Sequence, residues 1–330
     1  MPLSLRRGHV TGVVQRAEGL VRLEVDDRPC IAYPRLTGPV ALGDDVVVNV
    51  QAVELRLGSG GFDVLHVNLT RGLGLAAEAG AHVMKLPYTS LQHAVRHAEE
   101  DGILPETLAG LPVVCCTLHS QVAPVCAGIG SGSRIAYVQL PGGALPVSLS
   151  DTVRALKARG LVETAVAVGA CVDGDVACVT VAAALAWCAA GEMDAVVCSI
   201  GPGIVGTGSR LGHGGIACAE ALAAARVLGG RPILAARASE ADPRDRHRGI
   251  SHHARAVLEL AGEVELGWPA SADDAGVAGA VPVETSGWRE ACDGLPLAHM
   301  GRGPDEDGLY FEAAYAAGRL AASGRRAPSS

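Results

Sequence analysis

Two hydrophobic periodicities divide the chain. From residue 8 to about residue 68, apolar and polar residues tend to alternate with period two, most clearly in residues 21–25 and less strictly in residues 45–50. Pro34, Gly38, Gly43 and the glycines of residues 58–61 interrupt this alternation. A period of two is typical of short strands with one buried face. The pattern therefore predicts a small N-terminal antiparallel β-domain or barrel over residues 1–70.

After residue 81 the pattern changes to apolar runs that are each followed by a helix-like segment. The expected strands are residues 82–86, 112–117, 135–140, 164–168, 195–200, 232–236 and 295–300. The expected helices are residues 90–100, 150–159, 176–190, 251–261 and 307–322, with an alanine-rich helix after residue 215. Because parallel strands need a crossover, this alternation predicts an α/β domain over residues 71–322 with a mostly parallel sheet and flanking helices. A doubly wound sheet is favoured, a barrel-like sheet is the alternative, and the polar tail at residues 323–330 should fray.

The stretch AVVCSIGPGIVGTGSRLGHGG, residues 195–215, combines a strand, a glycine loop and a helix start. Glycine lets a ligand approach the backbone, and a helix start offers free N–H groups to an anion. The candidate ligand-binding residues here are Gly201, Gly203, Gly206, Thr207, Gly208 and Ser209. The first three glycines also fit G-x-G-x-x-G, but Arg237 ends the next strand where NAD binding would need an acid, so NADP is the nucleotide alternative. A glycine turn required only by close packing is the structural alternative.

A second constellation, DPRDRHRGISHH, covers residues 242–253. Ser251 is a plausible N-cap that places His252 and His253 in the first helical turn, where the helix dipole lowers their pKa and keeps them neutral. Neutral imidazole can accept a proton or ligate a metal, so His252 and His253 are catalytic candidates. The candidate metal ligands are His247, His252, His253 and Asp242, although their spacing matches no established motif. Arg244 and Arg248 could neutralise an anion, and a capped helix after a charged surface loop is the structural alternative.

Further polar residues follow other predicted strands. His119 is a third catalytic candidate, and the adjacent Ser120 is favoured as an N-cap or substrate contact over a nucleophile, because no G-x-S-x-G elbow surrounds it. His299 and Arg302 are ligand-binding candidates at the end of the last expected strand. The carboxyl ends of parallel strands share one edge of a sheet, so we expect these groups to converge there.

Composition narrows the function classes. The formal net charge of -8 argues against nonspecific nucleic-acid binding, which needs a basic surface. The start of the chain lacks the apolar segment of a secretory signal, and the most apolar helix candidate is too short to span a membrane. Ten cysteines lie scattered in apolar runs without a C-x-x-C pair, which indicates small buried residues in a reducing cytoplasm. The high apolar content is compatible with a homo-oligomer and equally with buried helices.

Four motifs together carry a resemblance. With GPGIVGTGSRLGHGG, ADPRDRHRGISHHARAVL, MKLPYTSLQ and HMGRGPDEDGLYFEAA, the chain resembles an uncharacterised bacterial protein family, domain of unknown function thirty-eight sixty-six. The likeness covers nearly the whole chain. It implies a cytoplasmic bacterial protein of this length and transfers no activity or catalytic residue.

These features favour a cytoplasmic enzyme, of hydrolase or transferase type rather than an oxidoreductase, that acts on a small anionic metabolite, such as a phosphorylated one, bound at the glycine loop. In this hypothesis His252 or His253 transfers protons. A noncatalytic nucleotide or anion sensor and a His/Asp metal-dependent hydrolase are the alternatives. The sequence assigns no cofactor.

Overall fold

The computed structural model describes residues 3–56 and 60–323. The chain divides into two units, Met1–Val95 and Arg96–Ser330. Residues 71–95, which the sequence pattern assigns to the α/β domain, group with the N-terminal unit. The predicted frayed tail lies outside the described residues apart from Ser323.

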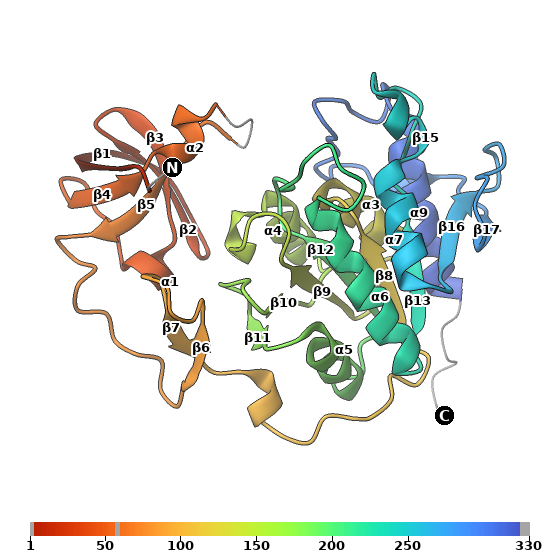
Figure 1. Ribbon diagram of the computed structural model, residues 1–330, viewed down its shortest axis with the longest axis horizontal. Helices are drawn as coiled ribbons and strands as arrows, with labels where there is room; N and C mark the ends of the chain where they lie inside the picture. The colour runs from red at the N-terminus through yellow and green to blue at the C-terminus, as the bar shows by residue number, and fades with distance from the viewer. Residues whose placement is uncertain (1–2, 57–59, 324–330) are drawn as a thin grey trace. The chain divides into compact units, whose positions relative to one another are not determined.

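The first unit contains a closed five-stranded barrel in the order β1-β2-β3-β5-β4 (Figure 1). Its elements are β1 (Leu5–Ala17), β2 (Leu20–Val25), β3 (Arg28–Ala32), α1 (Pro34–Thr37), β4 (Asp45–Asn49), α2 (Gln51–Glu54) and β5 (Asp63–Asn68). All neighbouring strands are antiparallel except β3 and β5, which are parallel. Val46 and Val48 point into the barrel core while their neighbours are partly exposed, as a period of two requires. The predicted N-terminal β-barrel is confirmed.

A short hairpin, β6 (Val83–Lys85) with β7 (His93–Val95), follows the barrel. The helix predicted over residues 90–100 is wrong, because residues 93–95 pair with β6 and only a 3₁₀ turn, Ala98–Glu100, forms after them. Pairing with a neighbouring strand here overrides a local helical pattern.

The second unit is built on an open eight-stranded sheet in the order β11-β10-β9-β12-β8-β13-β16-β17, in which every pairing is parallel. The strands are β8 (Pro112–Cys116), β9 (Ile135–Leu140), β10 (Thr164–Val168), β11 (Val176–Cys178), β12 (Ala195–Ile200), β13 (Arg231–Ala235), β16 (Glu265–Pro269) and β17 (Ala280–Val283). The helices are α3 (Val122–Ile129), α4 (Asp151–Ala158), α5 (Val181–Ala190), α6 (Ala217–Val227), α7 (His252–Ala261), α8 (Trp288–Ala291) and α9 (Gly308–Ser323). A two-stranded ribbon joins β14 (Ala238–Ser239) to β15 (Gly249–Ile250). The predicted α/β fold is confirmed, and its sheet is open rather than barrel-like.

Alternate residues of the central strands enter two separate cores. On β8, Val113 and Cys115 pack under α5, α6 and α7, whereas Val114 and Cys116 pack under α3, α4, α8 and α9 (Figure 1). Strands buried on both faces read as continuous apolar runs, which explains why β9, β10 and β12 have the predicted bounds. All ten cysteines are buried, as their apolar surroundings predict.

The edges of the sheet differ from the prediction. The helix expected over residues 176–190 begins as β11, and α5 starts only at Val181. Strands β16 and β17 have no counterpart in the prediction, and residues 295–300 form no strand. There, His299 and Arg302 instead exchange two main-chain hydrogen bonds across a tight turn. Within the described residues, no helix combines the length and the apolar character that crossing a membrane requires.

Helices α3 and α9 touch through glycine. A Cβ atom on Gly318 would lie 2.1 Å from the Val125 carbonyl oxygen, and one on Gly128 would lie 2.3 Å from the Tyr315 carbonyl oxygen. Helix propensity alone would make Gly318→Ala stabilising by about 0.5–1 kcal/mol. Overpacking costs about 1–3 kcal/mol, so the packing effect should exceed the gain in propensity.

We therefore expect Gly318→Ala to lower the melting temperature by several degrees in thermal unfolding, since about 1 kcal/mol corresponds to roughly 2–4 °C at this size. Gly102→Ala is the control, because a Cβ atom there meets nothing within 4 Å. A stabilised Gly318→Ala protein would contradict the close α3–α9 contact.

Candidate functional site

The polar residues of the second unit gather beyond the carboxyl ends of three adjacent central strands, β12, β8 and β13. The connection after β8 runs through α3 on one face of the sheet, whereas those after β12 and β13 run through α6 and α7 on the other. Open α/β sheets bind ligands at the carboxyl edge where the connections reverse in this way. The predicted convergence at one edge therefore has a topological cause.

Four histidines and three arginines meet around one carboxylate at this edge. We call them the histidine–arginine cluster, which consists of His213, Arg237, Asp242, Arg244, His247, His252, His253 and Arg302. The glycine loop supplies one histidine, the segment after β13 and the start of α7 supply most of the rest, and the turn before α9 supplies the last arginine.

The imidazoles contact one another directly. His213 stacks on His253 with 3.7 Å between ring centroids. The centroids of His252 and His253 are 4.3 Å apart, and His247 lies 4.9 Å and 5.0 Å from them. Ser251 holds this arrangement, because its hydroxyl caps α7 by accepting from the His253 amide at 3.2 Å and lies 2.7 Å from His247 Nδ1. The predicted N-cap is confirmed.

Asp242 is fully buried and organises the arginines. Arg244 donates to both of its carboxylate oxygens, at 2.9 and 2.8 Å. Arg302 and Arg237 lie 3.6 and 3.7 Å from the same carboxylate, and Arg237 also contacts His253 Nδ1 at 3.0 Å. The hydrogen bonds from Arg244 hold the pKa of Asp242 well below its usual range, despite burial. Asp242 therefore stays ionised and ties three segments together.

The histidines are neutral at physiological pH. Burial, together with the charges of Arg237 and Arg244, lowers the pKa of His247 to about 3. Burial, the facing His213 and Arg237 lower the pKa of His253 to about 3. Burial lowers the pKa of His213 as well, reinforced by His252 and opposed by the Arg210 main chain. Neutral imidazole retains a lone pair that can accept a proton or bind a metal.

Several buried polar atoms of this region make no well-formed hydrogen bond to any residue that the structure describes. They are both ring nitrogens of His213, Nε2 of His252, Nη2 of Arg302, Nε2 of His299 and Oδ1 of Asp307. Burying such atoms without a partner is costly, so each of them calls for an explanation.

The tight turn of His299 and Arg302 joins the cluster to α3 and α9. His299 stacks on Tyr310 at 3.8 Å, and Ser120 Oγ lies 2.6 Å from the Tyr310 hydroxyl and 3.4 Å from His299 Nδ1. Arg302 also donates to Asp307 at 3.2 Å. The structure thus places His299 beside the cluster to which Arg302 belongs, with Ser120 held by a tyrosine rather than poised as a nucleophile.

The glycine loop packs closely against a neighbouring loop and closes on itself. A Cβ atom on Gly201 would lie 2.0 Å from the Ala144 carbonyl oxygen, so this glycine lets two loops approach closely. The Thr207 hydroxyl donates to the Gly212 carbonyl oxygen at 3.1 Å, and the Ser209 hydroxyl accepts from the Gly212 amide at 2.9 Å. Gly203, Gly206 and Gly208 are exposed around this closed hairpin. The loop's contribution to the cluster is His213.

Two other candidates also lie apart from the ring contacts of the cluster. His119 is held by Ser150 Oγ at 2.6 Å from Nε2 and by the Ile200 carbonyl oxygen at 3.2 Å from Nδ1. Burial lowers its pKa to about 4. With both nitrogens occupied, His119 anchors the end of β12. Arg248 contacts the Asp242 main-chain oxygen at 3.3 Å rather than its carboxylate.

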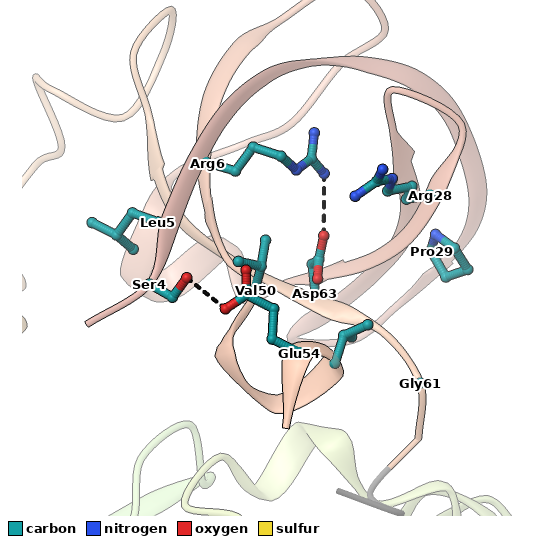
Figure 2. Close-up of a pocket in the computed structure, with 10 residues that line it drawn as sticks. Ser4, Leu5, Arg6, Arg28, Pro29, Val50, Glu54, Gly61 and Asp63 are labelled. Carbon is teal, nitrogen blue, oxygen red and sulfur yellow. Dashed lines mark hydrogen bonds and ion pairs between the residues drawn. The ribbon is translucent and has the colours of Figure 1, made fainter. Parts of the chain in front are cut away.

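The barrel unit has a cavity of its own, of about 490 Å³. Figure 2 shows Arg6 and Arg28 facing Asp63 inside it, with Glu54 at its rim. Arg6 bridges Asp26 and Asp63. Because its charged groups largely compensate one another, this cavity has less capacity for an anion than the cluster.

Sequence reasoning missed two central residues. His213 belongs to the glycine motif, whose many glycines suggest anion binding by the backbone rather than by this side chain. Arg237 enters the sequence interpretation only as a residue that would favour NADP over NAD. A histidine inside a glycine-rich loop at a strand end was the available signal for His213. No sequence signal indicates that the Arg237 side chain is buried, although it is only 4% exposed.

We expect Asp242→Asn to destabilise the protein by about 3–5 kcal/mol, because it leaves buried guanidinium groups without their counter-charge. The control Asp305→Asn should change the free energy of unfolding by less than about 0.5 kcal/mol, since that side chain is 97% exposed. Urea unfolding measures both. Inorganic phosphate should stabilise Asp242→Asn more than the wild type, and equal stability losses in the two variants would contradict the central role of Asp242.

The search among curated proteins found no match. The model of the family described as "Protein of unknown function (DUF3866)" matches residues 29–318. This range contains the whole histidine–arginine cluster, and the match confirms the resemblance carried by the four motifs. The chain therefore belongs to the family of proteins of unknown function DUF3866.

Proposed function

We propose that the protein is a cytoplasmic enzyme of the hydrolase or transferase type that binds a small anionic metabolite, such as a phosphorylated one, at the histidine–arginine cluster. The main support is the excess of guanidinium donors around the buried carboxylate of Asp242. Arg237, Arg244 and Arg302 share Asp242, and Nη2 of Arg302 has no hydrogen-bond partner among the described residues. An oxyanion beside these groups would gain charge-assisted hydrogen bonds in a site screened from water.

The neighbouring imidazoles suit proton transfer to or from such a ligand. His213 is the strongest candidate, because it is only 6% exposed and neither of its ring nitrogens makes a well-formed hydrogen bond to a described residue. His253 accepts from Arg237, which is always charged, so its Nδ1 lone pair is already used. The arginines therefore bind the anion in place of the glycine-loop amides, and the glycine loop positions His213 beside it.

A noncatalytic sensor is the second candidate. The barrel's own cavity favours it, because a second unit with a binding surface could report on the ligand state of the cluster. The two candidates share the binding step and differ only in turnover.

Binding is tested with inorganic phosphate and pyrophosphate in thermal unfolding. A ligand at 100 times its Kd stabilises by about 2.7 kcal/mol, or roughly 5–10 °C at this size. We expect this shift in the wild type and in Arg289→Gln, whose guanidinium faces the exposed Asp305, but not in Arg302→Gln. A shift that survives equally in Arg302→Gln would contradict anion binding at the cluster.

Turnover is tested with His213→Gln against the control His82→Gln in the other unit. Using p-nitrophenyl phosphate and any stabilising metabolite as substrates, we expect kcat to fall by about 10²–10⁴-fold in His213→Gln while phosphate binding persists. Wild-type binding without turnover of any bound metabolite would favour the sensor, and unchanged kcat in His213→Gln would exclude His213 as the proton carrier.

A further inference from the structure

Three imidazoles of the cluster lie close enough to share one ion. His247, His252 and His253 each offer a ring nitrogen, and these three atoms lie within 4.8 Å of one another. His247 belongs to the 3₁₀ turn Asp245–His247, whereas the other two begin α7, so two separate segments present the set. Strand β15 lies between those two segments along the chain and pairs with β14.

We propose that His247, His252 and His253 bind a borderline transition-metal cation, with zinc as the reference case, and leave one coordination position open. The inference rests on the proposed function for the identity of the site and deepens it by giving three of its histidines a ligand role. Three protein ligands with a free fourth position is the arrangement of catalytic rather than structural zinc sites. The oxygen of an anionic metabolite, or a water molecule, fits that position.

The hydrogen-bond pattern around the rings supports this assignment. Nδ1 of His247 is fixed by the Ser251 hydroxyl at 2.7 Å, which orients the ring and leaves Nε2 for a metal. Nε2 of His252 is buried and has no hydrogen-bond partner among the described residues. A metal-binding histidine needs one ring nitrogen that is free to bind the metal, and a hydrogen bond at its other nitrogen orients the ring.

The ligand set also selects the class of ion. Calcium and magnesium require oxygen ligands, and both oxygens of the Asp242 carboxylate accept hydrogen bonds from Arg244. Imidazole nitrogen without carboxylate suits zinc, cobalt, nickel or copper. We therefore expect the ligand set to consist of the three histidines without Asp242.

Arg237 competes with the metal for His253, the third ligand. Its guanidinium donates to His253 Nδ1 at 3.0 Å, which keeps the proton of the neutral ring on Nε2. Metal binding at Nε2 moves this proton to Nδ1 and displaces Arg237. The displaced Arg237 guanidinium can then pair with the Asp242 carboxylate, which lies 3.7 Å from it. Removing the Arg237 donor should accordingly tighten metal binding.

The test uses the full chain, stripped with EDTA, titrated with Zn²⁺ by calorimetry and assayed for retained metal after desalting. We expect about one zinc per wild-type chain and visible d–d absorption of a four-coordinate site with Co²⁺. His252→Gln should weaken zinc binding by more than about 100-fold, since even outer-sphere changes cost about 10–100-fold. His9→Gln, an exposed histidine in the barrel, should bind as the wild type does.

Arg237→Gln keeps all three ligands and should bind zinc more tightly than the wild type. Absence of zinc binding, equal binding in His252→Gln, or unchanged binding in Arg237→Gln would each overturn the proposal. Phosphate-induced stabilisation of the EDTA-stripped protein separates the two hypotheses. If phosphate binds and zinc does not, the metal site fails while the proposed function stands.

Discussion

One buried carboxylate holds the edge of the sheet together. Asp242 is ionised and inaccessible to water, so its burial is tolerable only because Arg244 pairs with it bidentately while Arg237 and Arg302 stand nearby. These arginines come from the loop after β13 and from the turn that precedes α9. A charge that must be compensated in place thus helps to fix the turn before α9 relative to the loop after β13.

The fold explains why this charge lies at an edge. Every central strand is buried on both faces, so polar side chains find room only where strands end and the chain turns toward a helix. Beyond β12 the chain must first pass the loop of residues 142–144, and a side chain at Gly201 or Gly214 would collide with its backbone. The glycines therefore allow the hairpin that carries His213 onto the rings of α7.

The same facts set the limits of sequence-based prediction. Strands such as β9 and β12 were predictable because burial on both faces leaves an uninterrupted apolar run, whereas β16 contains Gly267, which lets α9 approach to within 2.6 Å of where its Cβ would lie. Ser251 and the histidines after it were predictable from local capping. The stacking of His213 on His253 was not, since it joins residues from different loops. Glycine is equally required for anion contact and for tight packing, so residue type alone could not separate those roles.

Anion and metal binding at this edge would reinforce each other. Three guanidinium groups, of Arg237, Arg244 and Arg302, face only two carboxylates, those of Asp242 and Asp307. A divalent metal ion on the histidines adds to this excess of positive charge. The guanidinium groups repel the metal ion and weaken its binding, whereas the added charge strengthens the binding of a neighbouring anion. Coupling between two ligands is reciprocal, so a bound anion must raise the affinity for the metal by the same factor. Arg237, which contacts both His253 and Asp242, is the residue through which this coupling would act.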